Sequence, residues 1–354
     1  MMSLASLAIL GVLLLDPVTI EIDRKPAVVG EVVRTGPQGI SVRLTADQPA
    51  QDIAWYELRG GELPDGVPRQ FEQVASQAWR AHTRLMRGDA AGAMADYASM
   101  SQQYIWQAGR QSLDVCDGYA RCLILSGHRA RAIEPMLAWY LAAQGQDALS
   151  PDVDLGLRLR RDLPPVFSGD DLGLQLDPVP VDAQADDRTK LIRAYYELVL
   201  APEFDRQSVI DSIEALQRSI RARDPGLILL EQACFAQAHP DPTQRQSARD
   251  ALLRRTQTQP DSWTEVWARL ALGAALIRDD DPLMHDRGVV QLIHVIVRLS
   301  TIDPDLTLLA AQIAREHLEA TDRAQWGAQL VHDARKNIAG LNQSAERRET
   351  PNDD

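Results

Sequence analysis

Histidines are the residues of this chain that are best suited to chemistry, yet their spacing matches no metal-binding or catalytic motif. The seven are His82, His128, His239, His285, His294, His317 and His332. The chain also lacks a phosphate-binding loop, a Gly-x-Gly-x-x-Gly turn and a Gly-x-Ser-x-Gly nucleophile elbow. The sequence therefore predicts no catalytic residue, no metal site and no cofactor, and we expect a protein that is not an enzyme.

The densest group of polar residues spans 278–286 and reads Arg-Asp-Asp-Asp-Pro-Leu-Met-His-Asp. Clustered carboxylates beside His285 could hold a divalent cation. The same residues also fit an acidic loop whose last aspartate, Asp281, caps a helix that starts at Pro282, because negative charge is favoured at a helix N-terminus. We expect the second arrangement.

Cysteine usage gives no disulfide framework. Cys116 and Cys122 are six residues apart, which places them on different faces of a helix. No other cysteine lies near Cys234 in the sequence. No Cys/His spacing typical of zinc occurs either. We expect three buried thiols.

Charge excludes one large class of partner. Asp and Glu number 50 against 37 Lys and Arg, which gives a net charge of −13. Such a chain repels phosphate backbones, and no basic run is interleaved with aromatic residues, so we expect no nucleic-acid partner. Aromatic residues make up only 5% of the chain, so the core must be built from aliphatic residues, a composition that favours helix packing.

The chain begins with a hydrophobic run that ends at Asp16-Pro17. The run is shorter than the roughly 20 residues needed to span a bilayer, but it suits the apolar core of a signal peptide. No Lys or Arg precedes it and no Ala-x-Ala cleavage site follows it. We expect a signal peptide over residues 1–17, export to the periplasm or envelope, and no stable membrane span. The alternative is a cytoplasmic protein whose N-terminal segment packs on the domain behind it.

A small β module is predicted for residues 18–60. Val18, Ile20 and Ile22 alternate with polar residues, and two further alternating runs flank a Gly/Pro turn at 35–39. A last strand is expected at 52–58. Four or five short strands within this region suggest a small SH3-like or Sm-like barrel.

An internal sequence repeat after the β module predicts helical repeats. Residues 85–94 are echoed by 125–133, so that Gly88 aligns with Gly127, 39 residues on, and Ala93 with Ala132. A glycine can adopt the left-handed conformation that ends a helix, and alanine lets the next helix approach closely. The pattern predicts helix-turn-helix units.

Helical periodicity continues to the end of the chain, with one interruption. Asp-Pro pairs at Asp224, Asp281 and Asp303 are typical helix starts, and Pro260-Asp261 could act similarly. The expected order after the β module is helical repeats over 69–161, a Pro/Gly/Asp-rich crossover and domain boundary over 162–187, a second helical lobe over 188–341, and a disordered tail over 342–354.

The repeated segment resembles the tetratricopeptide-repeat (TPR) superfamily. Gly88-Asp89 with Ala93 and Met94, and Gly127-His128 with Ala132 and Ile133, match its small-residue pattern. The spacing is 39 rather than about 34 residues, and the Trp-Leu-Gly signature is absent. As a whole the chain also resembles exported helical-repeat proteins of planctomycete-type bacteria. The resemblance implies an α-solenoid that binds a protein or peptide on its concave face, and it carries over no catalytic residue.

We therefore expect a mainly α protein, a TPR-like solenoid behind a small β module, that acts as a scaffold or adaptor for a protein or peptide partner. Candidate groove contacts are Tyr97, Tyr104, Trp106 and Trp139, each of which could equally be a core residue. Two alternatives stay open: a hydrolase with a site between the two helical lobes, and a structural subunit of an envelope assembly.

Two aromatic pairs have a similar ambiguity. Trp263 and Trp267 share a helix face and could form a ledge for a ligand, although core packing is the expected role. For Tyr195 and Tyr196 we expect one ring to point inward and one outward.

Overall fold

The structure, a computed structural model, describes residues 17–45, 47–143, 153–154, 159–177, 180, 185–220 and 224–349. The chain divides into two compact units, one of residues 1–126 and 138–148 and one of residues 127–137 and 149–354. This division falls earlier than the crossover at 162–187, where we expected it, and the crossover belongs to the second unit. The expected signal peptide lies outside the described residues, apart from its last residue.

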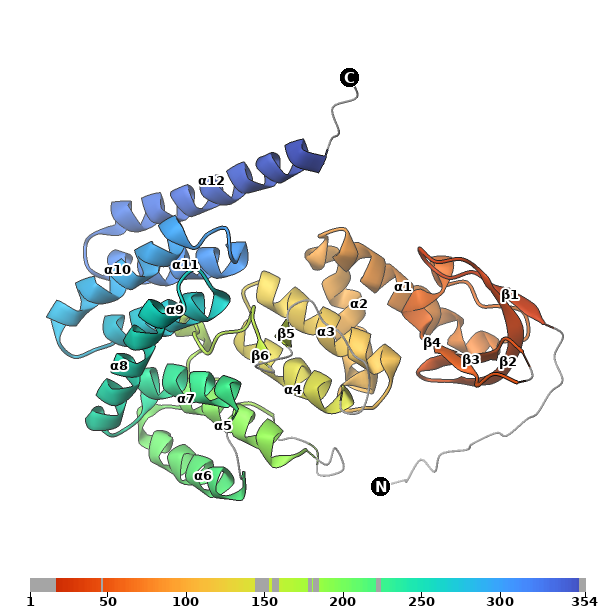
Figure 1. Cartoon of the computed structure of the whole chain (residues 1–354), viewed down its shortest axis with the longest axis horizontal. Helices are drawn as coiled ribbons and strands as arrows, with labels where there is room; N and C mark the ends of the chain where they lie inside the picture. The colour runs from red at the N-terminus through yellow and green to blue at the C-terminus, as the bar shows by residue number, and fades with distance from the viewer. Residues whose placement is uncertain are drawn as a thin grey trace. The chain divides into compact units, whose positions relative to one another are not determined.

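The described residues are mainly helical, with a small antiparallel sheet near the N-terminus, as the composition and periodicity predict (Figure 1). Strands β1 (Val18–Ile20), β2 (Val28–Gly36), β3 (Gly39–Arg43) and β4 (Gln51–Ile53) pair in chain order. Their alternation buries Ile20, Val32, Val42 and Ile53. The barrel subtype is a finer description that stays a prediction.

The strand expected at 52–58 ends early. After β4 the chain turns into the 3-10 helix η1 (Trp55–Glu57), where the Glu57 carboxylate accepts a hydrogen bond of 3.0 Å from the Ala54 N–H. This turn buries the indole of Trp55, which donates to the Pro37 carbonyl at 2.8 Å. The short 3-10 helices η2 (Arg59–Gly61) and η3 (Arg69–Phe71) lead to the helices.

Four helices follow: α1 (Glu72–Met86), α2 (Ala90–Tyr104), α3 (Arg110–Leu125) and α4 (Ile133–Ala142). The prediction from the repeated segment is confirmed here, because Gly88 and Gly127 have φ of +80° and +82° and each follows a helix end. Asp89 caps α2 by accepting a hydrogen bond from the Gly92 N–H. Ala93 and Ala132 are fully buried.

The tip of the β2–β3 hairpin joins the sheet to the helices of the first unit. The Pro37 carbonyl accepts hydrogen bonds from Trp55 and from the Tyr104 hydroxyl, both at 2.8 Å. The Gln38 amide donates to the Ser112 hydroxyl at 2.9 Å and accepts from the Ser112 N–H at 3.0 Å. The turn is tight enough that a Cβ on Gly39 would collide with the Ile53 carbonyl.

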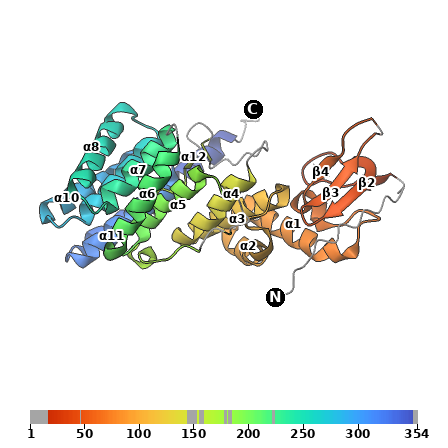
Figure 2. The ribbon, with the colours of Figure 1, turned by 90° about the horizontal axis from the view of Figure 1, so that it is seen from below.

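Eight helices of the second unit follow in chain order. They are α5 (Asp187–Leu200), α6 (Arg206–Ser219), α7 (Pro225–Ala238), α8 (Pro242–Thr258), α9 (Trp263–Ile277), α10 (Pro282–Arg298), α11 (Pro304–Ala320) and α12 (Ala324–Glu349). Helix α5 packs against α6, and α7 packs against α8 (Figure 2). From α8 to α12 each helix packs against the next, and α7 also packs against α5 and α9. Helix α12 continues to Glu349, beyond the expected end at 341, because Gln, Glu and Arg favour helix although they are polar.

The Asp-Pro helix starts are confirmed. Asp224, Asp281 and Asp303 each accept a backbone hydrogen bond at the start of α7, α10 and α11. Asp241 does the same before Pro242 at the start of α8. Helix α9 differs from the expectation, because Ser262 rather than Asp261 caps it.

The first residues of the crossover, 163–167, are buried among these helices, and side chains of several helices donate to backbone carbonyls of residues 161–167. The hydroxyl of Tyr196 (α5) donates to Leu163 at 2.6 Å, and the amide of Gln237 (α7) donates to Pro165 at 2.8 Å. The indole of Trp267 (α9) donates to Arg161 at 2.7 Å. The short strand pair β5 (Val153–Asp154) and β6 (Leu159–Arg160) precedes this segment.

We predict that Phe167→Ala destabilises the second unit by about 3–5 kcal/mol, because the buried ring leaves a cavity. The measurement is urea unfolding followed by tryptophan fluorescence. Leu172→Ala, at a position that is 39% exposed in the same segment, is the matched control and should cost about 1 kcal/mol or less. Equal effects of the two changes would show that the crossover is not part of the core.

Candidate functional site

The aromatic residues expected to face a partner lie mostly in the interior. Tyr97, Tyr104 and Trp139 are buried, and Trp106 is half-buried. Burial raises the pKa of Tyr97 well above its usual value and that of Tyr104 to about 12. These positions match the core alternative that the sequence left open, so a binding surface has to be sought elsewhere.

The two aromatic pairs also serve the fold. Trp263 and Trp267 meet edge to face at 5.5 Å, and the Trp263 indole donates to the Asp154 carboxylate at 3.0 Å. Tyr195 and Tyr196 are both buried, contrary to our expectation for the pair. Gln217 donates to the Tyr195 hydroxyl at 2.9 Å. Tyr196 and Trp267, together with Gln237 of α7, also donate to backbone carbonyls of residues 161–165. Both aromatic pairs therefore stabilise the fold and do not form a ligand surface.

A groove with a volume of about 480 Å³ runs over α8, α9 and α10 of the second unit. This size is within the range of about 300–1,000 Å³ that is usual for binding pockets. Its apolar lining consists of Leu253, Leu272, Leu276, Met284 and Val290. Leu253 and Val290 are 43% and 59% exposed, so much of this apolar surface meets solvent.

Charged residues form the rim of this groove. The Arg249 guanidinium pairs with Asp279, and the Asp286 carboxylate accepts from Arg323 at 2.8 Å. Asp250 and Arg287 also line the groove. An apolar floor with a charged rim is the usual composition of a surface that binds a protein segment.

Close packing of α9 on α10 brings the groove residues together. A Cβ on Gly273 would lie 2.7 Å from a methyl of Leu292, and one on Gly288 would lie 2.8 Å from the Gly273 carbonyl. Two glycines facing each other allow the helix backbones to approach more closely than side chains would permit. These glycines, one in each helix sequence, were a signal that our sequence reasoning did not use.

The exposed face of α10 continues the apolar surface. Leu283, Val290 and Val297 are 77%, 59% and 68% exposed and recur every seven residues. Because seven residues are almost two helical turns, the three side chains form one stripe. Sequence reasoning missed this stripe, since periodicity marks an apolar helix face without telling whether it is covered.

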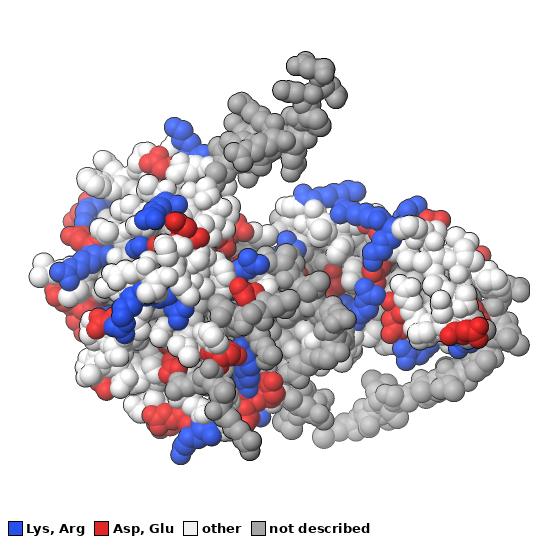
Figure 3. All heavy atoms as spheres, in the orientation of Figure 1, with Lys and Arg blue, Asp and Glu red and all other residues white. Residues whose placement is uncertain are grey.

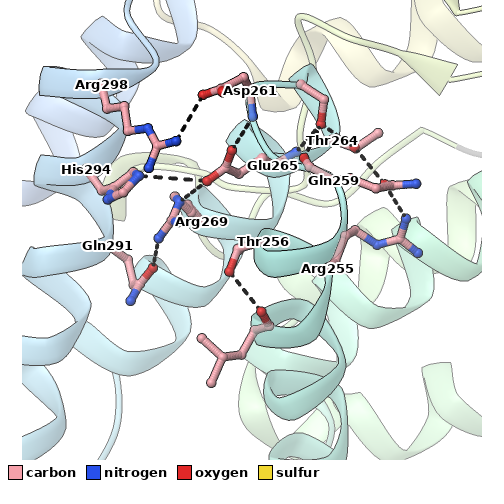
Figure 4. Close-up of polar contacts among 12 residues, drawn as sticks. Arg255, Thr256, Gln259, Asp261, Thr264, Glu265, Arg269, Gln291, His294 and Arg298 are labelled. Carbon is pink, nitrogen blue, oxygen red and sulfur yellow. Dashed lines mark hydrogen bonds and ion pairs between the residues drawn. The ribbon is translucent and has the colours of Figure 1, made fainter.

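A network of polar contacts supports the groove from the start of α9 (Figure 4). The Glu265 carboxylate is 1% exposed and accepts 2.7 Å hydrogen bonds from the Arg269 guanidinium and from the Asp261 N–H. Arg269 also donates to the Gln291 amide oxygen at 2.7 Å, and Gln291 lines the groove. The network therefore fixes α10 relative to α9 at the groove.

His294 lies beside Glu265, but the pair is poorly placed for proton transfer. Its Nε2 is 3.8 Å from the Glu265 carboxylate, and burial, with the nearby Arg269 charge, lowers the pKa of His294. The Glu265 carboxylate is almost inaccessible and already accepts two hydrogen bonds. The arrangement fits a structural support.

A second histidine–carboxylate pair lies in the first unit. His82 Nδ1 is 2.6 Å from the buried Asp114 carboxylate, which also accepts a 3.4 Å hydrogen bond from Tyr97. Burial alone would lower the pKa of His82, but the hydrogen bond and charge of Asp114 outweigh burial and raise it. Because the three residues come from α1, α2 and α3, the cluster links three helices.

The acidic stretch 278–286 takes the capping arrangement that we expected. Asp281 accepts from the Leu283 N–H at 3.0 Å, and His285 Nε2 is 2.7 Å from the Asp279 carbonyl. Within the described part of the chain, no group of three or more His, Cys, Asp or Glu side chains is arranged to hold a metal ion. The carboxylates of Asp279 and Asp286 are instead paired with arginines.

Comparisons of the chain with protein-family models, curated proteins and solved structures find no match. The likeness to TPR proteins therefore depends on the residues quoted above. Over the residues that the structure describes, no helix is both long enough and apolar enough to cross a bilayer.

We predict that Glu265→Ala lowers the free energy of unfolding by about 3 kcal/mol, because it leaves the half-buried Arg269 charge unpaired. Glu319→Ala is the matched control. It removes a pair with Arg315 at the same helical spacing but with both side chains well exposed, and should cost under about 0.5 kcal/mol. Urea unfolding measures both. A loss below about 1 kcal/mol for Glu265→Ala would contradict the role that we assign to the network.

Proposed function

We propose that this protein is a non-catalytic helical-repeat scaffold, and that the groove on α8, α9 and α10 binds a segment of a partner protein. The observation that carries the proposal is the exposed apolar surface of this groove, which has a charged rim. Catalytic pockets usually converge on accessible titratable groups. Here the two carboxylates that lie beside a histidine, Glu265 and Asp114, already form hydrogen bonds that stabilise the helix packing.

The helix arrangement supports a TPR-like solenoid as the finer description of the fold. From α7 to α12 each helix packs against the next, and α7 also packs against α5 and α9, so that α5, α7 and α9 form a layer. The crossover segment already covers residues of this layer, including Tyr196 and Trp267. The partner would therefore use the groove on α8–α10 rather than this covered layer.

The occupant that best fits the groove is an amphipathic helix. The stripe of Leu283, Val290 and Val297 repeats every seven residues, which is the spacing at which apolar residues recur on one face of a partner helix. Such helices bind in apolar grooves through anchors at i, i+3, i+4 and i+7. The alternative of an envelope subunit would place a second copy of the chain on the same stripe.

We also propose export to the periplasm or envelope. The support is the hydrophobic run before Asp16, whose length suits a signal peptide. A protein exported in this way would meet its partner outside the cytoplasm.

The groove predicts a selective loss of binding. Peptides that bind the wild-type protein are first selected from a displayed library of helical peptides. The double substitution Leu253→Glu and Val290→Glu should weaken their binding by at least about tenfold, because charges replace apolar anchors. Both positions are substantially exposed, so folding should be preserved. Fluorescence anisotropy of the synthesised peptides measures the affinity.

Phe204→Glu is the control for this experiment, because Phe204 is 83% exposed and lies outside the groove. It should leave peptide affinity unchanged. Selection of no peptide, or equal binding to all three proteins, would overturn the proposal. Dimerisation that the groove variant abolishes would instead favour a second copy of the chain as the occupant.

Export predicts that a tagged full-length chain is recovered from the periplasmic fraction of a Gram-negative host with its N-terminus shortened, as mass spectrometry would show. Leu10→Arg should block this, since a charge inside the apolar run prevents its insertion, whereas Ser3→Lys should not. Recovery of the intact wild-type chain from the cytosol alone would contradict export.

A further inference from the structure

His82 lies where the β sheet of the first unit meets the helices of that unit. It belongs to α1, and its Nδ1 is 2.6 Å from the carboxylate of Asp114 in α3. Its ring lies against that of Tyr56 in η1, with the two ring centroids 4.7 Å apart. The Tyr56 N–H in turn donates to the Gln111 amide oxygen of α3 at 3.2 Å. The imidazole therefore joins α1 both to α3 and to the turn that follows the sheet.

Asp114 is a buried carboxylate whose nearby positive charge depends on a proton. Its side chain is 9% exposed, and it accepts from His82 and, at 3.4 Å, from the Tyr97 hydroxyl. Among the described residues, no Lys or Arg nitrogen lies within 4.0 Å of it. Basic and acidic side chains are, by contrast, interspersed on the face shown in Figure 3. When His82 is neutral, Asp114 is thus a buried charge without a compensating one, which is costly.

The proton of His82 can exchange with water, because 30% of the side chain is exposed. Three charged groups act on the ring, namely Asp114 and, in the turn after β1, Asp23 and Arg24. Burial and the Arg24 charge lower the pKa of His82. The hydrogen bond and charge of Asp114, with the charge of Asp23, raise it by more, so the pKa lies above its ordinary value.

The tyrosines beside this pair do not titrate near neutral pH. Burial raises the pKa of Tyr97 in α2 and that of Tyr56 in η1, so both hydroxyls stay protonated. Glu57 and Arg110, whose charges also act on Tyr56, pair with each other at 3.1 Å. His82 and Asp114 are therefore the groups of the cluster whose charge can change.

We propose that the proton on His82 stabilises the junction between the sheet and the helices of the first unit, and that this junction opens more readily as the medium becomes alkaline. The inference is independent of the groove in the second unit. A protonated imidazole forms an ion pair with Asp114 and lies as a cation against the Tyr56 ring, so both contacts weaken when the proton leaves.

Linkage between protonation and folding gives the direction of the pH effect. The folded chain holds the His82 proton more tightly than the unfolded chain does. The stabilisation is therefore complete below the ordinary pKa of about 6.5 and is lost as the pH rises through the higher pKa of the folded chain. Burial, with the negative charge of Asp117, also raises the pKa of Asp114, which likewise lowers stability as the pH rises.

The first measurement is the ¹H–¹³C NMR titration of the histidine Cε1 groups in full-length protein labelled with [¹³C]histidine. The His82 signal is the one lost in His82→Gln. We expect its midpoint to lie above about 6.5 in the wild type and to fall to that value or below in Asp114→Asn, which removes the charge but keeps the side-chain shape. A wild-type midpoint at or below about 6.5, or one that Asp114→Asn leaves unchanged, would overturn the proposal.

The second measurement is amide hydrogen exchange of α1, α3 and η1 at about pH 5.5 and about pH 8.5, corrected for intrinsic exchange rates and followed by mass spectrometry. Protection should fall between the two pH values by about tenfold more in the wild type than in His82→Gln for each unit by which the His82 midpoint exceeds about 6.5. If His82→Gln does not fold, Asp114→Asn takes its place in this comparison.

His332→Gln is the matched control, because His332 is an exposed residue of α12 in the second unit. It should show the same fall in protection as the wild type. An equal fall in the wild type and in His82→Gln would contradict the role of the proton, even if the NMR midpoint were raised. Neither measurement involves a partner or the groove, so the outcome is separate from that of the proposed function.

Discussion

The second unit depends on one constraint, which is that the backbone of a buried irregular segment, residues 163–167, must find hydrogen-bond partners. Leu163 and Phe167 are fully buried, and a segment outside helices and sheets has no regular partners for its carbonyls. Tyr196, Gln237 and Trp267 supply donors from three helices, and Arg278 supplies a fourth to the Phe167 carbonyl at 2.6 Å. Each donor fixes its helix relative to the segment, so the order of the helices and the path of the crossover are determined together.

This arrangement has a consequence for binding. A layer of helices that is covered by the chain's own segment gives a partner little access, and the polar groups there are already paired. The exposed apolar surface lies instead on α8, α9 and α10, where Gly273 and Gly288 bring two helices close together and the network around Glu265 holds them. Rigid support of this kind lowers the entropy cost of binding, because the groove does not have to be ordered when the partner arrives.

Arginine has two distinct uses in this unit. Where a carboxylate is near, as for Arg269 beside Glu265, the guanidinium links helices and is satisfied within the fold. Where none is near, as for Arg278, the guanidinium donates instead to a backbone carbonyl, that of Phe167, at 2.6 Å. Both arrangements satisfy the guanidinium within the fold and link parts of the second unit.

The local features could be predicted from the sequence, because their causes lie within a few residues of one another. Asp-Pro pairs start helices by capping them, Gly88 and Gly127 end helices through the left-handed conformation, and alternation marks most of the strands. Which side chains face solvent could not be predicted from the sequence. Tyr97 and Trp139 were candidates for a surface and are buried, whereas Val290 and Val297 look like core residues in sequence and are exposed. Burial depends on neighbours that are distant in the sequence, and neither periodicity nor residue type specifies those neighbours.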